Sequence, residues 1–107
     1  MKVAITSTGQ EVTSKLDHRF GRCSYFAIHD FDTDQTDFIK NPNKEVAEGA
    51  GPASVQFIVS HGVSKIISGE FGGKVKKILE DLEVQMIMFN GPERTIQDIL
   101  SLMAVKP

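Results

Sequence analysis

The sequence predicts a three-layer α/β fold, in which a five-stranded mixed sheet carries helices on both faces, in the order β-β-β-α-β-α-β-α. Short apolar runs alternate with segments of helical apolar spacing in the second half of the chain. Turn residues separate two aromatic runs in the first half, which predicts an antiparallel hairpin. Helical crossovers make the later strands parallel. A chain of 107 residues fits a single domain, residues 1–107.

Five segments have the length and composition of β-strands. Lys2 to Thr6 contains a continuous apolar run, which is typical of a strand buried on both faces. Ser24 to Phe31 and Thr36 to Lys40 flank an Asp-rich turn and form the hairpin. Val63 to Ser68 and Val84 to Phe89 are the fourth and fifth strands, each preceded by a segment with helical periodicity.

Three segments have the periodicity of helices. The first begins near Pro52, since a missing N–H is tolerated at a helix start, and Gly62 supplies its stop. The third begins after Thr95, an N-cap residue that forms an approximate capping box with Asp98. The second has an apolar stripe composed of Phe71, Val75, Ile78, Leu79 and Leu82.

The stretch from Ser14 to Cys23 lies between the first two predicted strands and contains the only cysteine. Long loops in compact domains are usually functional or disordered. The whole connection from the first strand to Cys23 has apolar residues four apart, at Val12, Leu16 and Phe20, so we expect an ordered loop with a short helical turn. By contrast, Lys44 to Gly51 is polar and small, and we expect it to be mobile.

Composition excludes several classes of function. A formal net charge of −2 argues against a general nucleic-acid binder, which normally has a basic excess. No apolar run approaches the ~20 residues that span a bilayer, so we expect no membrane association. A single cysteine cannot form an internal disulfide, and a reducing cytoplasm is the simplest location.

The residue types in the long loop suggest a ligand site. Cys23 and His18 are candidate ligands for a metal or metal–sulfur cluster. Arg19 and Arg22 are candidate donors to an anion, and nearby arginines would lower the pKa of Cys23. The alternative is that Cys23 is a small buried hydrophobe. Two side chains do not complete a zinc site, which needs about four ligands.

The glycine-rich turn Gly69–Gly73 is a second candidate site. Gly69, Gly72 and Gly73 could present N–H groups to an anion at the start of the second helix, or simply form a tight turn. The glycine spacings match neither a P-loop nor a dinucleotide-binding fingerprint. His29 and His61, within a strand and a helix end, are expected to be structural.

Topology predicts where these candidates meet. Ligands of open α/β sheets bind beyond the carboxyl ends of parallel strands. Three turns should lie at that edge, namely Ser7–Gln10, Gly69–Gly73 and Asn90–Pro92, and the loop with Cys23 begins there. The chain lacks a GxSxG elbow and an acidic residue on its first strand, so we expect no enzyme activity.

The sequence resembles the dinitrogenase iron–molybdenum cofactor biosynthesis family. The resemblance is carried by Met1–Ile5, Leu16–Cys23, Phe26, Asn41–Asn43, Gly49–Gly51 and Gly69. It implies a ribonuclease H-type fold and the binding, storage or delivery of an iron–sulfur or iron–molybdenum cluster without catalysis. It also implies His18, Arg19, Arg22, Cys23 and Gly69–Gly73 as contacts, and a cofactor-assembly protein as partner.

Three hypotheses about function follow. The first is a cytoplasmic carrier or scaffold for an anionic metal–sulfur cofactor. The second is an interaction module that binds a partner protein or a small anion at the same sheet edge, without metal. The third is a hydrolase, as the fold type alone would allow, but fold does not imply function and the acidic residues of such a site are missing.

Overall fold

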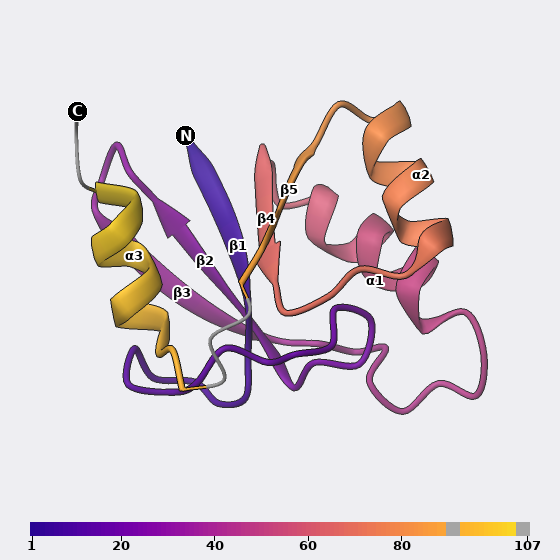
Figure 1. The fold of residues 1–107 in the computed structure, drawn as a ribbon, viewed down its shortest axis with the longest axis horizontal. Helices are drawn as coiled ribbons and strands as arrows, with labels where there is room; N and C mark the ends of the chain where they lie inside the picture. The colour runs from indigo at the N-terminus through magenta and orange to yellow at the C-terminus, as the bar shows by residue number, and fades with distance from the viewer. Residues whose placement is uncertain (90–92, 105–107) are drawn as a thin grey trace.

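A computed structural model, which describes residues 1–89 and 93–104, confirms the predicted architecture. Within these residues five strands and three helices follow in the predicted order (Figure 1). They are β1 (Lys2–Ser7), β2 (Tyr25–Asp30), β3 (Gln35–Lys40), α1 (Ala50–Val59), β4 (Lys65–Ser68), α2 (Gly73–Asp81), β5 (Gln85–Met88) and α3 (Ile96–Ala104).

The sheet is mixed and β1 is its central strand. The strand order is β3-β2-β1-β4-β5. β1 pairs antiparallel with β2 and parallel with β4. The β2–β3 hairpin is antiparallel, and β4 and β5 are parallel. This order and these directions are those of a ribonuclease H-type fold, as expected.

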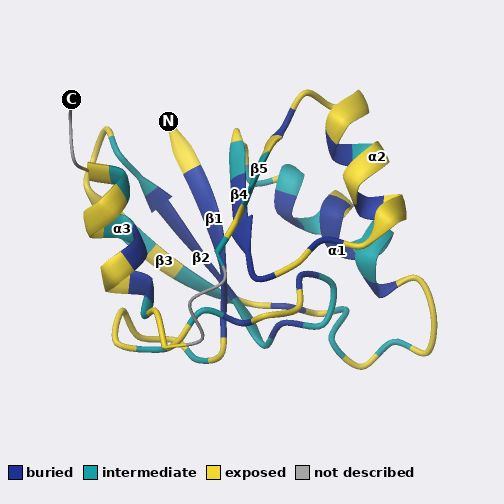
Figure 2. Cartoon of the chain, viewed as in Figure 1, coloured by how far each residue is buried: buried dark blue, intermediate teal, exposed yellow. Residues whose placement is uncertain are grey.

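The helices cover both faces of the sheet. α1 and α2 lie on one face and α3 on the other (Figure 1). Side chains alternate along a strand, so Ala4 packs toward α1 and α2 while Ile5 packs toward α3. Figure 2 shows the buried residues concentrated on the central strands and the inner sides of the helices. No helix in the described ranges has the length and apolar character needed to cross a membrane.

The start of α3 has the predicted capping box. The Asp98 N–H donates to Thr95 Oγ1, and the Thr95 N–H donates to Asp98 Oδ2, each at 3.1 Å. Two side chains thus satisfy main-chain donors reciprocally where the helix itself offers no acceptor. The helix accordingly begins at Ile96.

Two predictions from apolar spacing are wrong. The loop that contains Val12, Leu16 and Phe20 has no helical turn, and the three side chains do not share one face. Phe20 is buried against α1 and α2, whereas Leu16 packs on the α3 side. The side chain of Val12 is 39% exposed. Leu82, assigned above to the stripe of the second helix, is the C-cap of α2 and is 49% exposed. Spacing alone fixes neither a helix end nor the face toward which a loop residue turns.

Replacing Glu83 with glycine is expected to stabilise the protein by about 0.5 to 1 kcal/mol. Glu83 follows the C-cap of α2 with φ of 59°, a left-handed conformation that crowds a Cβ atom. Its side chain is exposed, so few contacts are lost. Chemical unfolding measures the gain. Glu83→Ala keeps the Cβ and serves as control, and an equal gain in both variants would contradict the conformational explanation.

Candidate functional site

The loop between β1 and β2 is fixed at the carboxyl end of β1. The Asp17 N–H donates to the Thr6 carbonyl at 2.9 Å, and the Thr6 hydroxyl donates to the Asp17 carbonyl at 2.7 Å. The Asp17 carboxylate accepts the Arg19 N–H at 3.0 Å and is almost fully buried. These bonds hold the loop in place where the predicted site residues begin.

Gly69 allows the turn after β4 to contact this loop. The Gly69 N–H lies 3.4 Å from the Asp17 carbonyl, and a Cβ added at Gly69 would lie 2.6 Å from the His18 Cα. Arg19 and Glu70 then pair in an isolated parallel bridge. In this structure Gly69 therefore acts through packing, and its N–H is directed to Asp17. Contact between Gly69 and an anion stays a prediction.

Gly21 and Gly51 join the same loop to the starts of two helices. A Cβ at Gly21 would lie 2.8 Å from the nitrogen of Gly51. A Cβ at Gly51 would lie 2.7 Å from Cγ2 of Val75 in α2. The loop, the start of α1 and the start of α2 therefore meet at very close range, although they are far apart in the sequence.

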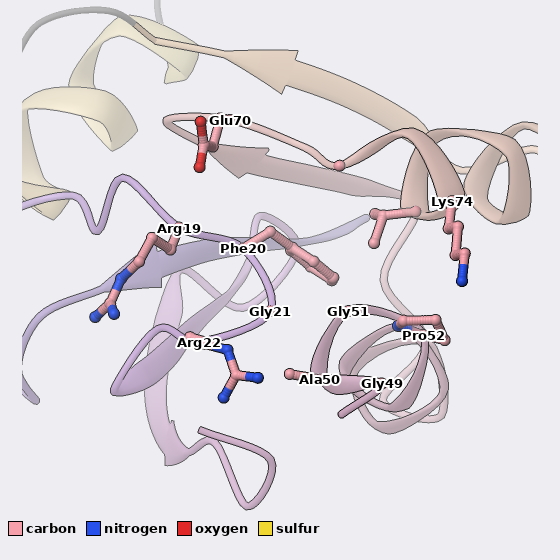
Figure 3. A pocket seen from close by; sticks show the side chains of 12 residues that line it. Arg19, Phe20, Gly21, Arg22, Gly49, Ala50, Gly51, Pro52, Glu70 and Lys74 are labelled. Carbon is pink, nitrogen blue, oxygen red and sulfur yellow. The ribbon is translucent and has the colours of Figure 1, made fainter. Parts of the chain in front are cut away.

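A cavity of about 430 Å³ opens where these three segments meet (Figure 3). The loop contributes Arg19–Arg22 and the start of α1 contributes Gly49–Pro52. Residues around the start of α2 complete the lining; these are Glu70, Gly72, Lys74 and Val75. The cavity is thus built from two helix N-termini and the loop that was expected to hold the site.

Both helices that start at this cavity lack a side-chain cap. Gly49 precedes α1 and Gly72 precedes α2, and neither helix has a capping side-chain hydrogen bond or an acidic residue in its first turn. The first N–H groups of a helix have no acceptor within it, and the peptide dipoles add partial positive charge there. Two such helix starts at one cavity favour the binding of an anion.

Three cationic side chains and one carboxylate line the cavity, which gives it a net positive charge. Figure 3 shows the Arg22 guanidinium directed toward Ala50 at the start of α1, whereas Lys74 lies on the opposite side of the view, near Pro52. Arg19 extends away from the helix starts in the same view. Glu70 is the carboxylate, and it lies on the far side of the loop from Arg22 (Figure 3).

Arg22 also holds the segment that precedes α1. Its Nη1 donates to the carbonyls of Lys44 and Val46 at 3.1 and 2.8 Å, and Nη2 lies 3.5 Å from the Ala47 carbonyl. These hydrogen bonds fix the first half of the segment Lys44–Gly51, which was expected to be mobile. A guanidinium has five N–H donors, so Arg22 retains donors for a ligand.

His18 lies on the surface beside the cavity. Its side chain is 70% exposed, and its Nε2 is 3.3 Å from Glu70 Oε2. The imidazole does not line the cavity itself but contacts a residue that does. An exposed imidazole is accessible to a metal, and a metal-ligand role for His18 stays a prediction.

Cys23 lies in the core on the α1 and α2 side and is fully buried. Burial raises the pKa of the Cys23 thiol to about 12, and the negative charge of Asp17 contributes to this rise. The expectation that arginines lower this pKa is wrong: Arg19 acts in that direction, but desolvation of the thiolate outweighs it. Cys23 and the exposed His18 therefore do not form one site here, and a ligand role for Cys23 stays a prediction that requires its exposure.

The other two histidines make contacts within the fold, which fits the structural roles expected of them. His29 is 5% exposed and its Nδ1 lies 2.7 Å from Thr36 Oγ1. His61 Nδ1 lies 2.9 Å from the Phe57 carbonyl at the end of α1. Across residues 1–89 and 93–104, no three His, Cys, Asp or Glu side chains group in a way that could hold a metal ion.

Comparison with protein families decides the identity of the chain. Residues 1–105 match the family described as dinitrogenase iron-molybdenum cofactor. The chain belongs to this family. The loop, the Gly69 turn and the helix starts that surround the cavity all fall within the matched residues.

Two solved structures resemble this member of the dinitrogenase iron–molybdenum cofactor family. A candidate NifB protein from Thermotoga, placed in the DUF35 family, is 31% identical with a TM-score of 0.81, over 96% of this chain and 86% of that one. The apo form of the orange protein from Desulfovibrio gigas is 21% identical with a TM-score of 0.88, over 95% and 85% of the two chains, and shares the fold. No curated protein shows a significant match.

Gly72 and Gly73 differ from the other glycines at the site of this family member. A Cβ added at either would have no atom within 4 Å, and neither has a positive φ. Neither packing nor backbone conformation therefore requires glycine at these positions. Their effect is to leave the first N–H groups of α2 free of neighbouring side chains, which fits the anion interpretation of this turn.

Sequence reasoning missed two contributors to the cavity of this protein. Gly49–Gly51 belongs to the segment that the sequence predicts to be mobile, and Lys74 is not among the predicted site residues. Two glycines on either side of the first residue of α1, Gly49 and Gly51, were the available signal, but the contact of Gly51 with Gly21 is long-range. Of the turns expected at this edge, Ser7–Gln10 does not line the cavity, and Asn90–Pro92 lies outside the described residues.

Proposed function

We propose that this protein binds and carries an anionic cluster of the iron–sulfur or iron–molybdenum type, or a precursor of one, during metal-cofactor assembly. The observation that carries the proposal is the meeting of two uncapped helix N-termini with Arg22 and Lys74 at one cavity. Membership of the dinitrogenase iron-molybdenum cofactor family supports a cargo of this class.

The residues present suit an anionic cargo. N–H groups at the starts of α1 and α2 would donate to its sulfur or oxygen atoms, and Arg19, Arg22 and Lys74 would balance its charge. A cavity of about 430 Å³ lies within the usual range of small-molecule sites. His18 is the side chain proposed to donate to a metal, while Cys23 would do so only if the loop opened.

The proposed role is delivery without catalysis, to a cofactor-assembly protein in the cytoplasm. A buried, reduced thiol such as Cys23 is compatible with that compartment. The net charge of −2 supports a cargo held locally at the cavity rather than binding of the protein to nucleic acid.

Anaerobic titration with tetrathiomolybdate, or with ferrous iron and sulfide, tests the proposal by absorption spectroscopy. Lys74→Gln should weaken binding about fivefold, since one charge contact near a surface contributes about 1 kcal/mol. Lys76→Gln is the matched control, because Lys76 is exposed on the same helix but does not line the cavity. A wild-type spectrum unchanged by either cargo, or equal losses in the two variants, would overturn the assignment.

A second candidate function is an interaction module that binds a small anion or a partner protein at this edge without metal. Burial of Cys23 favours this interaction module. Of the two predicted metal ligands, His18 and Cys23, only His18 is exposed. Phosphate and molybdate distinguish the candidates. Binding of both as tightly as tetrathiomolybdate, unaffected by His18→Ala, would favour the module over the cluster carrier.

A further inference from the structure

Asn41 is a buried amide at the junction of the cavity loop and the segment after β3. It is 2% exposed, and its Nδ2 donates to the carbonyls of Gly21 and Cys23, each at 3.1 Å. Its Oδ1 accepts the Asn43 N–H at 3.0 Å. The two N–H donors of this side chain therefore join the segment after β3 to the cavity loop, and its acceptor closes a turn within its own segment.

Ser54 extends this network into α1. Its side chain is fully buried, and its Oγ donates to the Gly21 carbonyl at 3.0 Å and lies 3.4 Å from Asn41 Oδ1. The carbonyl of Gly21 is thus held by side chains from two different elements. The same glycine packs against the main chain of Gly51 at the start of α1.

We propose that Asn41 is a positioning residue for the cavity and that Ser54 assists it. Asn41 does not line the cavity. It fixes Gly21 against the start of α1 and so places Arg22 and the first N–H groups of that helix around the same space. This inference rests on the proposed function, since it explains how the anion site keeps its shape.

The chemistry of Asn41 favours this role over simple packing. Burial of an amide costs free energy unless its polar atoms find partners, so an apolar residue would fill a core position at lower cost. The amide is useful here because the loop turns two carbonyls, those of Gly21 and Cys23, into the core. A fully satisfied network of this kind specifies one geometry.

Variants of the network test the inference with tetrathiomolybdate as the probe, titrated anaerobically into ¹⁵N-labelled protein. Asn41→Ala should weaken binding about tenfold and Ser54→Ala about threefold. Both should shift the amide resonances of Gly21 and Gly51 before the probe is added. Ile99→Val is the control, because Ile99 is fully buried on the α3 side, far from the network, and this variant should bind the probe within about twofold of wild type.

The outcomes separate this inference from the proposed function. Failure of the wild-type protein to bind the probe would overturn both. Tight binding by wild type together with equal binding by the two network variants would overturn the positioning role alone. An equal loss in Ile99→Val would assign the effect to general stability and would also overturn it. If Asn41→Ala does not fold, Ser54→Ala is judged by the same criteria.

Discussion

Raising the pH from about 9 to about 12 is expected to destabilise the wild-type protein by up to about 4 kcal/mol more than the Cys23→Ala variant. Burial raises the pKa of the Cys23 thiol from 9.0 to about 12, so the folded protein holds this proton more tightly than the unfolded chain does. Below pH 9 the thiol is protonated in both states and its full contribution is present. Above pH 9 the unfolded chain releases the proton, and the contribution is lost as the pH approaches 12.

Urea unfolding at a series of pH values from 8 upward measures this difference, with the free energy of unfolding compared between the two proteins at each pH. Other groups titrate in the same range, but they are common to both proteins and cancel in the difference. Equal slopes for wild type and Cys23→Ala would contradict the prediction. They would mean that the thiolate is tolerated in the folded state, as a ligand site would require.

The state of Cys23 bears directly on the carrier hypothesis. A thiolate is the form that binds metal, and at neutral pH the buried thiol is protonated. Direct ligation by Cys23 would therefore need the loop that contains Phe20 and Cys23 to leave the core. Recognition of a cluster through the N–H groups and cationic side chains at the cavity does not require the loop to move. For that reason the proposed carrier function is based on these groups and not on Cys23.

The fold was predictable from the sequence because its signals are local. The apolar run of β1, the turn between β2 and β3, and the Thr95–Asp98 capping box each lie within a few residues, and each is found in the structure. Leu82 was assigned wrongly because an apolar spacing continues past the last helical turn. The helix ends there because of the main-chain conformation of Leu82 and Glu83. The spacing of apolar residues carries no information about that conformation.

The candidate site was predictable only in part, because long-range contacts build it. The loop and the Gly69 turn were placed correctly by topology. The contact of Gly21 with Gly51, and the bonds of Arg22 to the carbonyls of Lys44 and Val46, join segments that no local pattern connects. The residue types around Cys23 suggested a lowered pKa, yet burial, which depends on the whole fold, decides its direction.

Gly69→Ala is expected to destabilise the protein by about 2 to 3 kcal/mol, the upper range for overpacking a close contact. The added Cβ would lie 2.6 Å from the His18 Cα and 2.8 Å from the His18 carbonyl oxygen. Both are main-chain atoms, so the loop cannot give way by a change of side-chain rotamer. It must move as a unit, and the Thr6–Asp17 hydrogen bonds resist that movement.

Gly73→Ala is the matched control for this prediction, because a Cβ there meets no atom within 4 Å and lies at the first helical position of α2. Alanine at that position should leave the free energy of unfolding within about 0.5 kcal/mol of wild type or raise it slightly. Chemical unfolding of the two variants compares them directly, and similar stabilities would contradict the packing role of Gly69. The same two variants separate two functions of glycine at one turn. Gly69 acts through close packing of the loop, so its substitution should lower stability first. Any effect of Gly73→Ala on cargo binding would have to arise because the added methyl group covers the N-terminus of α2.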